Sequence, residues 1–396
     1  MCFVGIKQAI GIRPIAIQHS GLGKLVVGFL ALSVSILLSS CAGTPEGKRA
    51  HFFYPPLPAK PRIQFLTSFS GTNLNKSKKS SFSDFVLGKN AAEEQGVITK
   101  PYGVGMFDGK IYVVDLRLPG YHVLNFEDQI IKKVMGAGEG RMIKPVNITF
   151  DANGTKYITD TQRERILVFD KDDNFLRSLG ENKQFKPADV VITTEFLYVT
   201  DLKHHKIHVL DKDTGKNVFS FGKAGSKEKD FFFPTNMAMT KDGYLYISDT
   251  GNYRVLKYVR GGKQLVQQFG KIGSGVGQFA RPKGVAVDKE ARMYVVDSAF
   301  ENVQIFDAQG NILLFFGEPG NKIGNLNLPV DIEIDYDHVD YFKKYARQGF
   351  EIEYLIMVTS QFGPNKVNVY GFGEIAESKL PAAEEVDDAA APSDYY

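Results

Sequence analysis

Six positions at equivalent places in a repeating pattern hold the residue types most suited to chemistry. Each follows a recurring proline by two residues, and together they are Gly103, Asn147, Asp189, Asn236, Gly284 and Asp331. Carboxylate and amide oxygens are the ligands that Ca²⁺ prefers, so a calcium site formed by Asn147, Asp189, Asn236 and Asp331 is one interpretation. A water-filled channel lined by polar groups is the simpler interpretation and needs no ion. The set contains no Glu and no His to act as a base, so a hydrolytic site is less favoured than either the calcium site or the water-filled channel.

A second set of candidates is basic and follows the recurring Asp residues described below. The short loops after these residues carry Arg117, Arg163, Arg165, Lys203, His204, His205, Lys206 and Arg254. Equivalent loops of a ring of repeats lie on one rim, so these side chains predict a basic sector there. Such a sector would bind an acidic protein face, a phosphorylated lipid headgroup or an acidic polysaccharide. Ordinary solvated charge explains the same residues equally well.

Three histidines crowd one turn and strand, at His204, His205 and His208. The first two fall in a loop and the third in a strand, so we expect that they do not converge. Without an acidic partner nearby, three histidines are a weak indication of zinc.

Other motifs with known chemistry are absent from the sequence or have another explanation. Residues 273–277 (GSGVG) resemble a phosphate-binding loop, but they join two strands and lack the helix that such a loop requires. The sequence contains no G-x-S-x-G, no H-E-x-x-H and no P-loop. Two cysteines exclude a disulfide framework and a Cys-rich metal site, and no C-x-x-C-H is present to attach a haem.

A repeat of about 45 residues must position all of these candidates. Its opening prolines are Pro101, Pro145, Pro187, Pro234, Pro282 and Pro329. Five units then contain an aromatic and β-branched run that ends in Asp, at Asp115, Asp160, Asp201, Asp249 and Asp297. Four short strands in each unit are typical of a β-propeller blade. One Asp in each of five blades indicates a structural role, since a short acceptor at a strand end satisfies backbone N–H groups in the turn.

The sixth unit contains only three strands, at 330–335, 353–360 and 366–372. Residues 62–71 have the apolar run and final glycine of a fourth strand. We therefore expect an N-terminal strand to complete the last blade, which would close the ring and remove its open edge.

The units resemble the NHL-repeat family, most clearly from Phe233-Pro234 through Tyr246-Ile247-Ser248-Asp249 to Phe269-Gly270. This resemblance covers about residues 61–373 and implies an all-β, six-bladed β-propeller of the NHL type with small helical inserts. The likeness is to bacterial NHL-type lipoproteins of the cell envelope, some of which accompany export or multihaem cytochrome systems. Some related six-bladed propellers are lactonases, esterases or lyases that hold a metal in the central channel.

The N-terminal residues have the pattern of a lipoprotein signal. Lys7, Arg13 and Lys24 precede an uncharged apolar run at 25–38, and Leu38-Ser39-Ser40-Cys41 resembles a lipobox. We expect a signal peptide over 1–40, lipidation of Cys41 and an outer-membrane location, with an uncleaved membrane helix as the alternative. Beyond residue 40 the chain has 45 basic and 45 acidic residues, so a nucleic-acid partner is not expected.

Several flanking and inserted segments complete the organisation. We expect a lipidated tether over 41–60, the propeller over 61–375 and a disordered acidic tail over 376–396. Inserts interrupt the repeat at 72–99 and 336–351. In the second insert Val339, Phe342 and Tyr345 have helical spacing beside Lys343 and Lys344, so Phe342, Lys343 and Lys344 are further candidates for contact with a partner. Packing of this apolar stripe over the blade edge is its favoured role.

The favoured function is a lipid-anchored, non-enzymatic scaffold that holds a protein partner in the cell envelope. The alternative is a metal-dependent enzyme of the lactonase, esterase or lyase kind that uses the central channel. Fold alone does not separate the two.

Overall fold

A computed structural model describes residues 51–71, 97–126 and 130–376 of the chain. The signal peptide, Cys41, most of the first insert and the acidic tail lie outside these described residues, so the predictions for them stay predictions. Within the described residues no helix is both long enough and apolar enough to cross a membrane.

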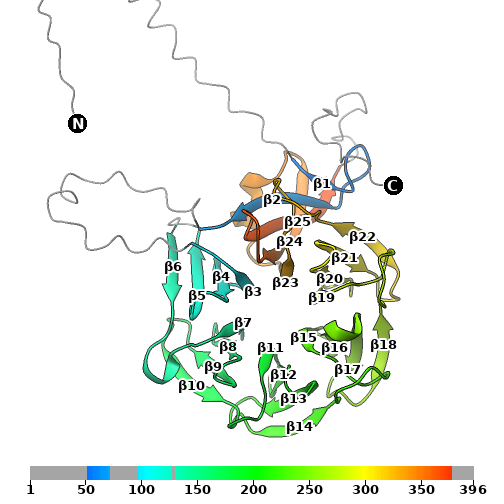
Figure 1. Ribbon diagram of the computed structural model, residues 1–396. Helices are drawn as coiled ribbons and strands as arrows, with labels where there is room; N and C mark the ends of the chain where they lie inside the picture. Colours follow the sequence, from blue (N-terminus) through cyan, green and yellow to red (C-terminus); the bar gives the residue numbers. More distant parts are fainter. Residues whose placement is uncertain (1–50, 72–96, 127–129, 377–396) are drawn as a thin grey trace, which may run out of the picture. The chain divides into compact units, whose positions relative to one another are not determined.

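Six antiparallel sheets are arranged around a central channel, which confirms the predicted six-bladed propeller (Figure 1). The strands of blade 1 are β3 (Pro101–Phe107), β4 (Lys110–Asp115), β5 (Gly120–Asn125) and β6 (Ile130–Val134). Blade 2 has β7 (Pro145–Phe150), β8 (Lys156–Asp160), β9 (Arg165–Phe169) and β10 (Phe175–Leu179), and blade 3 has β11 (Pro187–Ile192), β12 (Phe196–Asp201), β13 (Lys206–Asp211) and β14 (Asn217–Phe221). Blade 4 has β15 (Pro234–Met239), β16 (Tyr244–Asp249), β17 (Arg254–Val259) and β18 (Leu265–Phe269), and blade 5 has β19 (Pro282–Val287), β20 (Met293–Asp297), β21 (Asn302–Phe306) and β22 (Ile312–Phe316).

The last blade is closed by the N-terminal strand, as predicted. Its sheet has the order β1-β2-β25-β24-β23, in which β2 (Ile63–Phe69) pairs antiparallel with β25 (Val367–Ile375). In Figure 1 the blue strand β2 lies beside the red strand β25, with β24 (Phe350–Ser360) and β23 (Pro329–Asp335) further in. The two ends of the propeller sequence therefore hydrogen-bond to each other, and no blade edge stays open between them.

The folded part begins about ten residues before the predicted boundary at 61. Strand β1 (Phe53–Tyr54) adds a fifth strand outside β2, and the Phe53 ring is buried against Phe350 at 5.7 Å between centroids. Residues 51–60 thus belong to blade 6 and are not tether. Their prolines hid this strand, since proline argues against a strand except at a sheet edge, where β1 lies.

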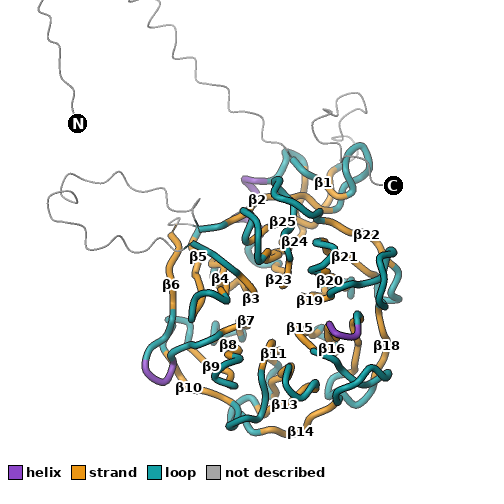
Figure 2. The backbone as a smooth tube through the Cα atoms, in the orientation of Figure 1, coloured by secondary structure: helices purple, strands orange, loops and turns teal. Residues whose placement is uncertain are grey.

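The insert at 336–351 forms two 3₁₀ turns instead of the predicted helical stripe. They are η3 (Val339–Tyr341) and η4 (Lys343–Tyr345), and η1 (Gly138–Gly140) and η2 (Thr250–Asn252) are the other short helices of the described residues (Figure 2). Phe342 is fully buried and lies 5.1 Å from Phe126 and 6.5 Å from Phe69. The prediction that Phe342 contacts a partner is therefore wrong, because its ring fills the junction between blades 6 and 1.

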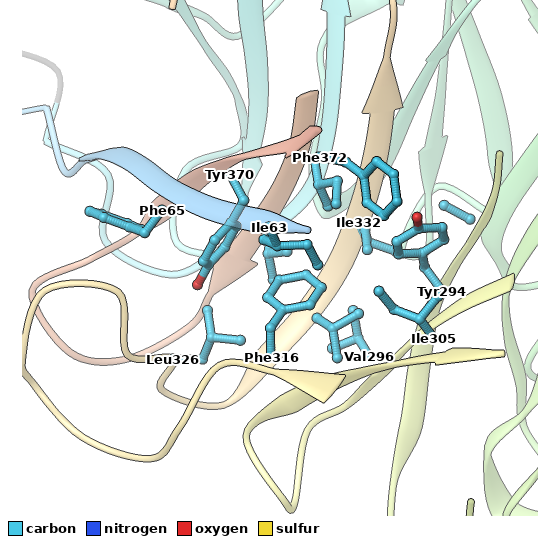
Figure 3. Packing of buried hydrophobic residues seen from close by; sticks show 14 of the residues in the cluster. Ile63, Phe65, Tyr294, Val296, Ile305, Phe316, Leu326, Ile332, Tyr370 and Phe372 are labelled. Carbon is cyan, nitrogen blue, oxygen red and sulfur yellow. The ribbon is translucent and has the colours of Figure 1, made fainter. Parts of the chain in front are cut away.

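The core lies in layers between neighbouring blades. Alternate residues of each strand face opposite sides of the sheet, so each blade buries apolar side chains against both neighbours. The largest cluster joins blades 5 and 6 and includes Ile63, Tyr294, Phe316 and Tyr370 (Figure 3). Residues near the start of the described chain thus meet residues of its last third in this one cluster.

The recurring Asp residues have the predicted structural role. Asp160, for example, accepts hydrogen bonds from the backbone N–H groups of Ile143 at 2.7 Å and Arg163 at 2.9 Å. It thereby ties the connector that enters its blade to the turn after β8. Asp115 and Asp297 make the same kinds of bonds in blades 1 and 5.

Candidate functional sites in the channel and on the rim

A β-bulge follows each opening proline and turns the second residue after it toward the channel. In blade 2, for instance, the pairing of β7 with β8 shifts between Pro145 and Asn147. Similar shifts occur after the prolines of the other five blades. Bulges of this kind re-aim a side chain, and here they bring together the polar side chains predicted to face the channel.

Those side chains hydrogen-bond to one another and to backbone in a polar layer. Asn147 Nδ2 donates to Asp189 Oδ1 at 2.7 Å, and Asn236 Nδ2 donates to Asp331 Oδ1 at 2.9 Å. The backbone N–H of Met237 donates to Asp189 Oδ2 at 2.7 Å, and that of Val104 donates to Asp331 Oδ2 at 3.1 Å. Each carboxylate thus joins its own blade to two others.

Glycine completes this layer in the two remaining blades. A Cβ on Gly103 would lie 2.1 Å from Asn147 Oδ1, and one on Gly284 would lie 2.8 Å from the Asp331 Cα. At both positions a neighbouring blade approaches so closely that only glycine fits without a shift of its neighbours.

Glu333 also faces the channel, and the sequence analysis missed it. It lies two residues beyond Asp331 on β23, and both line one cavity of about 260 Å³ with Asp189 and Asn147. The alternation of a strand was the signal that could have found it, because residues two apart share a face. The residues that line this cavity include three carboxylic acids and no His, Lys, Arg or Cys.

Burial raises the pKa of each of these acids. The pKa of Asp189 rises to about 7, and that of Glu333 rises to about 8 because of burial and the charges of Asp335 and Asp189. The pKa of Asp331 lies well above its usual range, through burial and then the charge of Asp189. Protons or a bound cation would relieve the repulsion among them.

A second cavity of about 200 Å³ lies near the proline ends of the inner strands, and Tyr102 and Lys283 contribute to its lining. Burial lowers the pKa of Lys283 to about 8. The Tyr102 hydroxyl donates to Asn236 Oδ1 at 3.4 Å, which connects this end of the channel with the polar layer.

Three of the four arginines predicted for a basic sector, Arg163, Arg165 and Arg254, are bonded within the protein, whereas Arg117 is exposed. Arg163 donates to the carbonyl oxygens of Glu139 and Arg141, and Arg165 donates to that of Glu181, all at 2.6 Å. Arg254 is buried and pairs with Asp249 at 2.9 Å. The prediction that Arg254 contacts a partner is wrong, since its guanidinium clamps the connector between blades 3 and 4 through the carbonyls of Lys227 and Asp230.

Other basic candidates lie at the surface. Lys203 and His204 are exposed on the turn between β12 and β13, and Lys206 begins β13. Lys343 and Lys344 are exposed on η4, where Lys343 pairs with Asp340 at 2.6 Å.

An aromatic pair beside the turn between β12 and β13 was not predicted from the sequence. Phe232 and Phe233 are 43% and 45% exposed, and the His205 ring lies 5.2 Å from the first and 4.6 Å from the second. We call Lys203, His205, Lys206, Phe232 and Phe233 the rim patch.

Two of the three histidines converge on an acid, contrary to the sequence-based expectation. His204 Nδ1 lies 2.6 Å and His208 Nε2 lies 3.0 Å from Asp201 Oδ2. Hairpin pairing was the signal that could have found this group. Because Lys206 pairs with Asp201, His208 stands two residues along β13 on the same face.

Comparisons with known proteins show the fold and nothing finer. No protein-family model matches the chain, and no curated protein is similar to it. A gluconolactonase from Xanthomonas campestris is 16% identical, with a TM-score of 0.50 over 69% of this chain and 86% of that one. A putative gluconolactonase is 13% identical, with a TM-score of 0.51 over 70% and 90% of the two chains. An auxiliary nutrient binding protein from Bacteroides thetaiotaomicron is 14% identical, with a TM-score of 0.54 over 79% and 77%.

These neighbours include proteins described as enzymes and one described as a binding protein. At such low identity they support a six-bladed propeller for this chain. The NHL type and the envelope location stay predictions.

Proposed function

We propose that this protein is a lipid-anchored, non-enzymatic scaffold of the cell envelope that holds a protein partner on the rim patch. The observation that carries the proposal is the exposed aromatic pair Phe232 and Phe233, which packs on His205, the first ring stacked and the second edge to face. Lys203 and Lys206 lie in the same turn as His205. Aromatic residues are enriched at protein interfaces, where they act as anchors in a partner's pocket. The two lysines favour a partner of complementary, acidic charge. The partner that fits is a protein face with an apolar pocket and an acidic border.

The backbone holds this aromatic pair in place before any partner arrives. The N–H of Phe232 donates to Asp249 Oδ1 at 2.6 Å, and its carbonyl accepts from the N–H of Gly251 at 2.7 Å. The N–H of Phe233 donates to His205 Nδ1 at 2.9 Å. A surface that is ordered in advance loses less conformational entropy on binding, which favours affinity.

The bonding of the other candidate residues also supports a scaffold. Asp189 and Asp331 accept backbone and amide N–H groups from neighbouring blades, and Arg163, Arg165 and Arg254 hold connector carbonyls. Groups that could do chemistry thus contribute to a rigid ring. Lipidation at Cys41 would keep this ring at the membrane, as in an accessory of an export or cytochrome system.

Site-specific cross-linking in intact cells tests the proposal. A photoreactive amino acid in place of Phe233 is expected to yield one protein adduct, because this ring would contact the partner. The matched control is the same replacement at Phe315 in β22, which is 53% exposed and distant from the rim patch. Lys203→Glu should weaken the adduct at position 233. Equal labelling from positions 233 and 315 would contradict the proposal.

A metal-dependent hydrolase is the second candidate, and Glu333 is the observation that favours it. Glu333, Asp189 and Asp331 place three carboxyl groups in one cavity with the amide of Asn147, a set of oxygen ligands that fits Ca²⁺. These residues would hold the ion, which would polarise a substrate carbonyl. Calorimetric titration with Ca²⁺ and assays on lactones and esters test this, with Glu333→Gln as the variant and Glu351→Gln, at an exposed position, as the control. Saturable binding and turnover, both lost only in Glu333→Gln, would replace the scaffold proposal.

A further inference from the structure

Three potential metal ligands meet at the rim end of blade 3. Asp201 Oδ2, His204 Nδ1 and His208 Nε2 all lie within 4.8 Å of one another, and both histidine nitrogens are within 3.0 Å of the oxygen. Asp201 and His208 are buried, and the side chain of His204 is 40% exposed. The group is therefore fixed on its inner side and open to solvent on its outer side.

In three other blades the same oxygen accepts a backbone N–H group, and in blade 1 it also lies 3.5 Å from His122 Nε2. Backbone N–H groups of the entering connector donate to Asp115 Oδ2 at 2.6 Å, and to Asp160 Oδ2 and Asp297 Oδ2 at 2.7 Å. In blade 3 the connector contributes only the N–H of Lys186, and this group donates to Asp201 Oδ1. Among the described residues, Asp201 Oδ2 is thus bonded to the two imidazoles alone.

In blade 4 the equivalent carboxylate oxygen has a purely structural role. We call this recurring Asp and the turn that follows it the corner of the blade. There Asp249 Oδ2 accepts from Asn252 Nδ2 at 2.7 Å and from Arg254 Nε at 2.9 Å. These two groups only donate, whereas an imidazole nitrogen can also bind a metal ion. Blade 3 has His204 at the place of Asn252, so one obligatory donor of this corner is replaced by a metal-binding group.

The ring of His208 is oriented by groups behind it. Its Nδ1 lies 3.1 Å from Ser220 Oγ and 3.4 Å from Asn217 Oδ1. If Nδ1 carries the proton and donates to these oxygens, Nε2 presents its lone pair toward Asp201 Oδ2. Hydrogen bonds of this kind to the second nitrogen accompany most metal-bound histidines.

The distances suit an ion after a small outward shift. Ligands about 2.05 Å from a tetrahedral zinc ion stand about 3.3 Å apart. The present separations of 2.6 and 3.0 Å would have to grow by about 0.7 and 0.3 Å, and the half-exposed His204, which needs the larger shift, can move. A water molecule would take the fourth position on the solvent side.

We propose that Asp201, His204 and His208 bind a divalent transition-metal ion of the zinc class at this corner. Two imidazoles and one carboxylate favour Zn²⁺ or Co²⁺ over Ca²⁺ and Mg²⁺, which prefer all-oxygen ligands. This site is separate from the channel, and it does not depend on the function proposed for the rim patch.

Titration with Co²⁺ tests the site directly, because four-coordinate Co²⁺ absorbs visible light. The chain is purified without a histidine tag, stripped with a chelator and titrated with Co²⁺, and Zn²⁺ is then added to displace it. We expect one equivalent to bind, visible absorption to appear, and Zn²⁺ to raise the melting temperature by its linkage to the folded state.

Two histidine variants make the test specific. His204→Ala should lower the affinity at least tenfold and abolish the melting shift, and its partly exposed position makes misfolding of the variant easy to exclude by circular dichroism. His338→Ala is the control, because its ring pairs with Asp335 in blade 6 instead of Asp201. Absence of stoichiometric binding, or equal binding by wild type and His204→Ala, would overturn the proposal.

Discussion

Phe65 of strand β2 lies directly opposite Tyr370 of strand β25, with the two rings edge to face and their centroids 5.5 Å apart. The Tyr370 ring also packs on Phe316 of blade 5 at 4.7 Å, and its hydroxyl donates to the carbonyl of Gly324 at 2.9 Å. One tyrosine near the end of the propeller sequence therefore ties the closing strand to the preceding blade (Figure 3).

Phe65→Ala should destabilise the whole ring, because it leaves a cavity where the first and last parts of the propeller meet. We expect a loss of about 3–5 kcal/mol in the free energy of unfolding, measured by chemical denaturation. Phe315→Ala is the control, since its ring is 53% exposed, and it should change stability by less than about 0.5 kcal/mol. A similar, small loss in both variants would show that the closing strand contributes little. Deletion of 62–70 should have a stronger effect and cause aggregation through the exposed edge of β25.

Features repeated in the sequence could be predicted from it, because the repeat supplies several copies of the same signal. The recurring prolines, the recurring Asp and the glycine after each outer strand together indicate six blades and the closing strand. The polar layer follows from the same period, as Asp189 and Asp331 occupy equivalent positions. Its bonding pattern does not follow, because it depends on Asn236 reaching past the blade that has Gly284.

Features that depend on one connector could not be predicted in this way. Arg254 and Lys203 both follow a recurring Asp, yet one is buried on Asp249 and the other is exposed. The difference arises from the carbonyls of Lys227 and Asp230, which lie in a connector whose path is set by tertiary packing. Phe342 is a related case. The favoured packing role of its apolar stripe agrees with its full burial, but helical spacing alone does not show which side of a short turn faces the core, so partner contact stayed an alternative until the structure excluded it.

Stability should fall as pH rises from about 5 to 8. Burial raises the pKa of Asp189 to about 7 and that of Glu333 to about 8, so the folded state holds protons that the unfolded chain has released. When the folded state binds more protons, the free energy of unfolding decreases with increasing pH. The pKa values of Asp115 and Asp201 are lowered instead, so these two residues stabilise the folded state when ionised. Their contribution is lost as pH falls below this window, and it does not change within it.

Glu333→Gln should flatten this dependence. The decrease in the free energy of unfolding between pH 5 and 8.5 should become smaller by about 4 kcal/mol at most. Thermal and chemical unfolding at several pH values measure it, with the exposed Glu351→Gln as the control. A pH dependence that is the same in wild type and Glu333→Gln would contradict the assignment of Glu333 to the channel cavity.

Cys41→Ala should block processing at the N-terminus. In cells supplied with a labelled fatty acid, the wild-type chain should incorporate label and the variant should accumulate as a larger, unlabelled precursor. Cys2→Ala is the control and should leave both size and labelling unchanged, because it lies within the expected signal peptide. Normal labelling of Cys41→Ala would refute lipidation at this residue.

The affinity of the cross-linked partner for the purified chain shows whether the rim patch is the surface that binds it. Binding is measured in solution for wild type, Phe233→Ser and Phe315→Ser, since the last two remove one exposed phenylalanine each at different places. We predict at least a tenfold weaker affinity for Phe233→Ser, which is the loss of about 1.4 kcal/mol or more expected for an aromatic anchor, and an unchanged affinity for Phe315→Ser. Equal affinities of all three proteins would contradict the assignment of the rim patch as the partner-binding surface.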